Sequence, residues 1–246
     1  MLTKGAFMSH ADIIQQYLSE RYPAKRFVPF ALFLAAAGML AVPGAEDFRT
    51  AATLRSGLLA AFTGYLIVLV LRIWDDLQDR KHDAHVHPDR ITLRDDAPRS
   101  LRYLARLSAS GAILILAAGS HPAPRLLVLA LLAASLGVWY GARELSKPMP
   151  VIGAHIVLIK YPVIAYIVAP GSTGSARELL MAAPMLIAVY LLLCIHEVLD
   201  DPALRRSRTA RGVLIAESAV MVPLTALLIA SALELDLSFF GRGSLP

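Results

Sequence analysis

Cysteine is almost absent from this chain, because Cys194 is the only one among 246 residues. A single cysteine excludes an intrachain disulfide and a metal centre built from several thiolates. The sequence also lacks the G-x-G-x-x-G, G-x-x-x-x-G-K-[ST] and G-x-S-x-G patterns. Their absence removes the usual sequence signs of a dinucleotide-binding fold, a P-loop and a serine nucleophile elbow.

Charged residues are also scarce, at 17% of the chain, while 57% of the residues are hydrophobic. This composition is typical of an integral membrane protein. Apolar stretches long enough, or nearly so, to cross a bilayer lie at 27–43, 54–74, 103–119, 124–141, 150–169, 179–199 and 213–235. We therefore predict an all-α fold, a polytopic transmembrane helix bundle of about seven spans around a central cavity.

Short connections between these stretches predict a single integral membrane domain over 1–246. Residues 1–26 form its N-terminal segment, 27–235 its transmembrane bundle and 236–246 its tail. Apolar side chains on one side of 9–22 predict an interfacial amphipathic helix that contacts membrane lipid.

The distribution of Lys and Arg predicts the orientation of the bundle. With the N-terminus inside, most basic loop residues fall on the cytoplasmic side, as in a bacterial-type inner membrane. The net charge of +5 then reflects this topology and contact with anionic lipid. No basic stripe carries interleaved aromatic residues, so we expect no nucleic-acid partner.

An acidic cluster follows the apolar stretch at 54–74. It consists of Asp75, Asp76, Asp79 and Asp83. Carboxylates at the end of a span are functional-site hypotheses by default, because they are costly unless something positive compensates them. Asp76, Asp79 and Asp83 have i, i+3, i+7 spacing, which predicts one helical stripe of repelling charges. Bound Mg²⁺ would relieve that repulsion, since it prefers carboxylate and phosphate oxygens.

A second acidic cluster, Glu197, Asp200 and Asp201, ends the stretch at 179–199. Glu197 and Asp200 are i and i+3, so they share a helix face, and Pro202 predicts that the helix ends nearby. Spans two and six run in the same direction, so both clusters are expected at cytoplasmic ends, facing one cavity. The pair predicts a site for Mg²⁺ and a diphosphate.

Basic residues near both clusters are candidate diphosphate ligands. They are Arg72, Arg80, Lys81, Arg90, Arg205 and Arg206. Arg72 is four residues before Asp76 and can pair with it instead, and Arg80 and Lys81 can act as local counter-charges of a solvated helix end. Lys160 lies within the stretch at 150–169, so we expect it to face the bundle interior and to pair with an acid or a phosphate.

The pattern DDxxDxxxD at 75–83, followed by His87-Pro88-Asp89-Arg90, resembles the first aspartate motif of the UbiA superfamily of intramembrane prenyltransferases. That motif reads NDxxDxxxD and precedes a loop with Arg and Pro. The segment 197–200 occupies the place of the second motif, DxxDxxxD. Tyr140 and Lys147 resemble a Tyr and a Lys that follow the fourth span of the family. Asp75 replaces the usual Asn, and Leu204 stands where motif two would have its third acid.

The resemblance implies a Mg²⁺-dependent prenyltransferase that moves an isoprenyl group from a prenyl diphosphate to a lipophilic or aromatic acceptor. It implies these metal ligands: Asp75, Asp76, Asp79, Asp83, Glu197, Asp200 and Asp201. It implies a catalytic role for Asp76, Asp79, Asp83 and Asp200. It implies that the donor is bound by Arg72, Arg80, Lys81, Arg90, Tyr140, Lys147, Lys160, Arg205 and Arg206.

Three alternatives share these features. A terpene cyclase of the same superfamily would capture the cation internally and need no acceptor. A phosphoribosyl transferase would use a different diphosphate and a lipid phosphate. A non-catalytic binding or transport protein would keep the acidic cavity without turnover. The incomplete second motif favours the last alternative, and the complete first motif opposes it.

Overall fold

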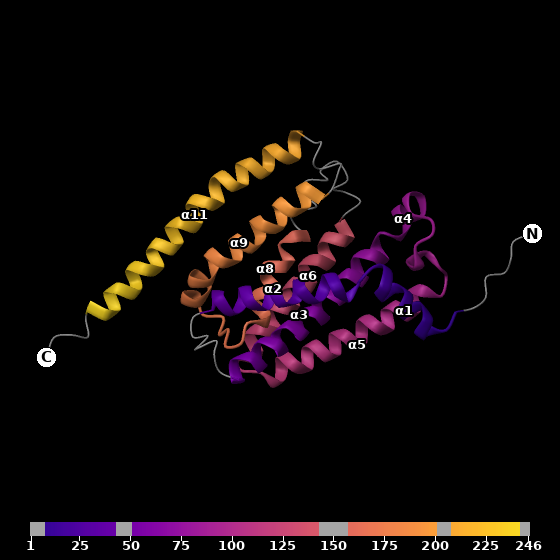
Figure 1. Ribbon diagram of the computed structural model, residues 1–246, viewed down its shortest axis with the longest axis horizontal. Helices are drawn as coiled ribbons and strands as arrows, with labels where there is room; N and C mark the ends of the chain where they lie inside the picture. The colour runs from indigo at the N-terminus through magenta and orange to yellow at the C-terminus, as the bar shows by residue number, and fades with distance from the viewer. Residues whose placement is uncertain (1–7, 43–50, 143–156, 201–207, 242–246) are drawn as a thin grey trace, which may run out of the picture.

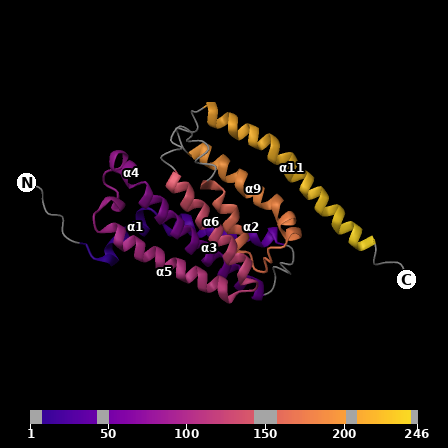
Figure 2. The same cartoon turned by 180° about the vertical axis from the view of Figure 1, so that it is seen from behind.

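The computed structural model describes residues 8–42, 51–142, 157–200 and 208–241. All elements in these ranges are helices, shown in Figure 1 and from behind in Figure 2. In chain order they are α1 (His10–Glu20), α2 (Ala24–Ala41), α3 (Ala51–Gln78), α4 (Arg80–Val86), η1 (Ile91–Leu93), α5 (Ala97–Ala118), α6 (Pro122–Ala142), α8 (Lys160–Val168), α9 (Ala176–Asp200) and α11 (Arg208–Gly241).

Six of the helices in the described ranges are long and apolar enough to cross a membrane. These spans are the whole of α2, α5 and α6, together with residues 53–78 of α3, 176–197 of α9 and 211–228 of α11. The predicted all-α membrane bundle is confirmed at this level, and the chain is an integral membrane protein by these spans.

The predicted span at 150–169 is represented by α8, which has only nine residues. Residues 150–156 lie outside the described part of the chain, so the predicted seventh span stays a prediction. Pro162 explains why α8 begins where it does. Its ring cannot donate a hydrogen bond and clashes with the carbonyl four residues earlier, which interrupts a helix at about Ile159.

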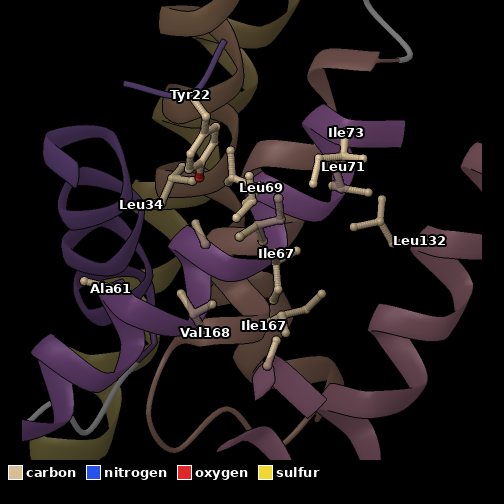
Figure 3. Packing of buried hydrophobic residues seen from close by; sticks show 14 of the residues in the cluster. Tyr22, Leu34, Ala61, Ile67, Leu69, Leu71, Ile73, Leu132, Ile167 and Val168 are labelled. Atoms are coloured by element: carbon tan, nitrogen blue, oxygen red, sulfur yellow. The ribbon is translucent and has the colours of Figure 1, made fainter. Parts of the chain in front are cut away.

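α3 runs through the middle of the bundle and packs against α2, α5 and α8. Figure 3 shows side chains of α3 meeting Leu34 of α2 and Ile167 and Val168 of α8. With 28 residues, α3 is about 42 Å long, at about 1.5 Å per residue. It is therefore longer than a hydrocarbon core of about 30 Å, and its polar end can extend beyond that core.

The end of α8 remote from Lys160 is fixed by buried polar contacts. Arg125 of α6 donates from Nε to the carbonyl of Ile167 at 2.7 Å. Glu178 of α9 accepts a hydrogen bond from the Tyr166 hydroxyl at 2.7 Å and from the backbone N–H of Thr173 at 2.7 Å. These contacts tie α8 to α6 and α9, which helps to fix the position of Lys160 at its other end.

The predicted amphipathic helix is confirmed as α1, and its capping box pairs Ser9 with Asp12. Its apolar side chains Ile13 and Tyr17 are buried in the protein core. α1 packs against α5 and η1. The expectation that this face contacts lipid is therefore wrong for these two side chains, because the bundle itself provides a nearer apolar surface.

Gly38 allows α2 and α8 to approach closely. A Cβ atom built on Gly38 would lie 2.1 Å from the backbone oxygen of Ala165. Small residues at such crossings are typical of membrane helix pairs, because they let the two backbones touch. A side chain here would push α8 away from α2.

We expect Gly38→Ala to lower the free energy of unfolding by about 1–3 kcal/mol, as overpacking does. Thermal unfolding of the detergent-solubilised protein, followed by circular dichroism, measures this change. Gly141→Ala is the control, since a Cβ at Gly141 meets nothing within 4 Å. Equal stability of both variants would contradict the close packing of α2 against α8.

Candidate functional site

The first acidic cluster lies where α3 turns into α4. α3 ends at Gln78, and Asp79 is the residue that precedes α4. Helical backbone hydrogen bonds continue across this junction, from Asp79 N to Asp75 O at 3.0 Å and from Asp83 N to Asp79 O at 2.8 Å. The helical spacing predicted for the acids therefore persists through a slight interruption. Asp76 and Asp83 are buried, whereas Asp75 and Asp79 are partly exposed.

Asp76 is bound mainly by side chains of the N-terminal segment. Arg21, just after α1, donates from Nη2 to Oδ1 at 2.6 Å and from Nε to Oδ2 at 3.3 Å. The Tyr17 hydroxyl donates to Oδ2 at 2.9 Å. Arg72 contributes an i, i+4 ion pair at 3.6 Å, as its spacing predicted. Asp76 thus has three side-chain partners although only 3% of its surface is exposed.

The protonation states of these partners follow from their surroundings. Burial, together with the negative charge of Asp76, raises the pKa of the Tyr17 phenol. Burial alone would disfavour the charged form of Arg21, but the hydrogen bond and charge of Asp76 outweigh it and raise the pKa of that guanidinium. At neutral pH both groups therefore carry their protons and act as donors.

Asp75 is bound by a different part of the chain. The Lys160 ammonium of α8 donates to Asp75 Oδ2 at 2.6 Å. Lys160 is 2% exposed and lies 5.3 Å from the centre of the Tyr161 ring. The prediction that this lysine faces the bundle interior and pairs with an acid is confirmed.

Asp83 and the loop after α4 form the third part of the cluster. Asp83 makes an ion pair with Arg90. Arg80 donates from Nη2 to the carbonyls of Leu93 at 3.1 Å and Arg94 at 3.3 Å, so it holds η1 against α4. The predicted cations Arg80 and Arg90 are therefore both at the cluster, whereas Lys81 is exposed.

Several polar atoms here are buried without a hydrogen-bond partner in the described part of the chain. They are Asp83 Oδ2, Arg72 Nε, Arg80 Nε and Thr92 Oγ1. Such orphaned atoms are costly, and in native proteins they call for an explanation. A cation suits the carboxylate oxygen, and phosphate oxygens suit the guanidinium N–H groups. A Mg²⁺ ion and a phosphorylated ligand at this cluster stay predictions.

The second acidic cluster is described only in part. Glu197 lies close enough to Cys194 to act on it electrostatically, as does Glu217 of α11. Asp200 is the last residue of α9, and its side chain is not described. Other predicted site residues lie outside the described residues: Lys147, Asp201, Arg205 and Arg206.

The ends of α3 and α9 lie at the same end of the bundle, because the two helices run in the same direction (Figures 1 and 2). α2 and α8 each pack against both of them. In the described ranges, no three His, Cys, Asp or Glu side chains converge as a metal site. A cavity shared by both acidic clusters therefore stays a prediction. Tyr140 packs against Trp74 of α3, with ring centres 5.4 Å apart, so it lies beside the helix that carries the first cluster.

Sequence reasoning missed Arg21 and gave Tyr17 only an apolar role. Arg21 follows Tyr17 by four residues, which puts a cation in line with the apolar face of α1. That spacing is a usable signal, because a charge in line with a buried face needs a partner. The partner itself, Asp76, is 55 residues away and requires the folded bundle to identify.

Searches with this chain find no matching family model, no similar curated protein and no similar solved structure.

The ion pair between Asp75 and Lys160 gives a stability test. We expect Lys160→Met to lower the free energy of unfolding by roughly 3 kcal/mol, because Asp75 then lacks its cation. The double variant Asp75→Asn/Lys160→Met should recover most of that loss, since no charge is left unpaired. Denaturant unfolding in detergent measures wild-type protein, both single variants and the double variant. A double variant as unstable as the sum of its single changes would contradict the pairing.

Proposed function

We propose that this chain is a Mg²⁺-dependent intramembrane prenyltransferase, which moves an isoprenyl group from a prenyl diphosphate to a lipophilic or aromatic acceptor. One observation carries the proposal. Around the end of α3, buried acids and bases lie together, and both signs include atoms without a hydrogen-bond partner in the described residues. A ligand that brings a cation and anionic oxygens together satisfies both signs at once.

The acids of the first cluster are the proposed metal ligands. Asp76, Asp79 and Asp83 would hold Mg²⁺ from one side, with Asp75 close by. Glu197, Asp200 and Asp201 are proposed as ligands from the second motif. When bound there, Mg²⁺ supplies Lewis-acid stabilisation of the charge that develops on the departing diphosphate.

The cations of the site would bind the diphosphate oxygens. Arg72 and Arg80 each have a buried N–H available, and Arg90 and Lys160 lie within the same charge cluster. Arginine suits this role because its planar fork pairs with two phosphate oxygens. Arg205, Arg206, Lys81, Lys147 and Tyr140 complete the proposed set from the resemblance.

The surroundings of the site suit an isoprenoid substrate. α3 is predominantly apolar over residues 57–71, and its end carries Arg72, Asp75 and Asp76. A prenyl diphosphate has the same division, with an apolar chain and a charged head. We propose that the chain lies along the bundle and the head at the end of α3. By the distribution of Lys and Arg, that end faces the cytoplasm of a bacterial-type inner membrane.

A second candidate is a protein in which the same charges serve only structure. The ion pairs of Asp75, Asp76 and Asp83 favour it, because each of these acids already has a basic partner. Such a protein would bind or transport a ligand without turnover, or would bind none. The orphaned atoms favour the first candidate.

Diphosphate release by the purified protein in lipid nanodiscs tests the proposal. Dimethylallyl, geranyl, farnesyl, geranylgeranyl and phosphoribosyl diphosphates are offered with Mg²⁺ or EDTA, with and without a membrane or cytosol extract as a source of acceptor. We expect release that needs Mg²⁺ and is abolished in Asp76→Asn and Asp79→Asn. Asp95→Asn should keep full activity, since this acid is exposed and is not among the proposed ligands.

Other results of the diphosphate-release assay would support the alternative functions. Release without extract would indicate a terpene cyclase, and release from phosphoribosyl diphosphate alone would indicate phosphoribosyl transfer. No release from any donor by a folded protein would refute the enzyme and favour the structural candidate. Asp79 is partly exposed, so its variant serves if Asp76→Asn fails to fold.

A further inference from the structure

We propose that Arg21 is an internal counter-ion that makes the site bind Mg²⁺ well only when a diphosphate is bound with it. This inference rests on the proposed function and adds a residue that determines its ligand specificity. Arg21 would exchange one anionic partner, the Asp76 carboxylate, for another, the diphosphate.

The Asp76 carboxylate already has donors on both of its oxygens. Arg21 contacts both carboxylate oxygens, with Nη2 2.6 Å from Oδ1 and Nε 3.3 Å from Oδ2. Tyr17 also donates to Oδ2. A metal ion that ligates Asp76 must therefore displace at least one contact of this guanidinium.

Binding of a metal ion to Asp76 without a diphosphate is unfavourable. Binding would exchange one cation at Asp76 for another, and would leave Arg21 with a weaker partner in a place where only 17% of its side chain is exposed. A charge without a partner in such surroundings is strongly disfavoured. The carboxylate cluster is thus protected from free divalent cations by its own arginine.

A diphosphate changes this balance because it brings new acceptors. Its oxygens can pair with the released guanidinium in the two-pronged way that arginine favours. Metal ion and diphosphate then promote each other's binding, and this coupling must be equal in both directions.

α1 itself has anchors that do not involve Asp76. Ile13 is fully buried against the bundle, and His10 Nδ1 lies 2.6 Å from the Ser100 hydroxyl of α5. The capping box at Ser9 fixes the start of the helix. α1 can therefore stay docked while the Arg21 side chain changes its partner.

Binding of Mn²⁺, a paramagnetic substitute for Mg²⁺, tests the inference in phosphatidylcholine nanodiscs. The dissociation constant is measured by electron paramagnetic resonance for Mn²⁺ alone and for its complex with inorganic diphosphate. We expect wild-type protein to bind the complex at least tenfold more tightly than free Mn²⁺. Arg21→Gln should bind free Mn²⁺ more tightly than wild type and the complex more weakly, so the preference falls severalfold.

Matched variants test whether the preference for the Mn²⁺–diphosphate complex comes from the Arg21 guanidinium. Arg26→Gln removes an exposed arginine near the start of α2 and should keep the wild-type preference. Arg21→Lys keeps the charge without the fork and should give an intermediate preference. If Arg21→Gln does not fold, Tyr17→Phe serves instead, because it removes one donor from Asp76 Oδ2 and should shift free Mn²⁺ binding in the same direction.

The outcomes separate this inference from the proposed function. Wild-type protein that binds neither free Mn²⁺ nor its diphosphate complex would refute the proposed metal site and the inference with it. Wild-type protein that binds the complex, and loses it in Asp79→Asn, would support the site. An unchanged preference in a folded Arg21→Gln variant would then overturn the role of Arg21 alone.

Discussion

Compensation of the aspartates at the end of α3 is the constraint on which the arrangement of the other helices depends. Carboxylates at the end of a long apolar helix repel one another and also meet the negative end of the helix dipole. The compensating cations come from three other segments: Arg21 after α1, Lys160 of α8 and Arg90 before η1. The first two ion pairs hold the end of α1 and α8 against α3, and the third joins the segment before η1 to α4. The same contacts therefore define both the local fold and the candidate site.

The apolar packing makes these ion pairs possible. Gly38 lets α2 and α8 touch, and the contacts of Arg125 and Glu178 fix the far end of α8. Lys160 is therefore held at a definite height in the bundle, where its ammonium reaches Asp75. Ion pairs of this kind contribute little by attraction alone once desolvation is counted. Their value lies in specifying one arrangement among many that are equally apolar.

Much of this could be predicted from hydrophobic stretches and spacing. The positions of the long helices follow from runs of apolar residues, and the i, i+4 pair of Arg72 and Asp76 follows from helix geometry alone. Lys160 was expected to pair with an acid, because a charge within an apolar stretch has few other options. Its partner Asp75 could not be chosen from the sequence, since several acids were equally possible.

The contribution of α1 was beyond sequence reasoning for a different reason. An amphipathic helix next to a membrane protein can bury its apolar face in lipid or in protein, and both environments are equally apolar. Only the folded bundle, with its surface on α5 and η1, decides between them. The position of the second acidic cluster relative to the first could not be predicted from the sequence either. It depends on how α3 and α9 pack in the bundle, and these helices are about a hundred residues apart in the chain.

The ion pairs also span different lengths of chain, and this has a consequence for biosynthesis. Arg21 and Asp76 are 55 residues apart, and Arg21 is made first. When the ribosome completes α3, the partner of Asp76 is already present on the nascent chain. Asp75 must wait for Lys160, which is synthesised 85 residues later. One half of the charge cluster can therefore assemble during translation of the first spans, whereas the other half closes only after α8 has entered the membrane.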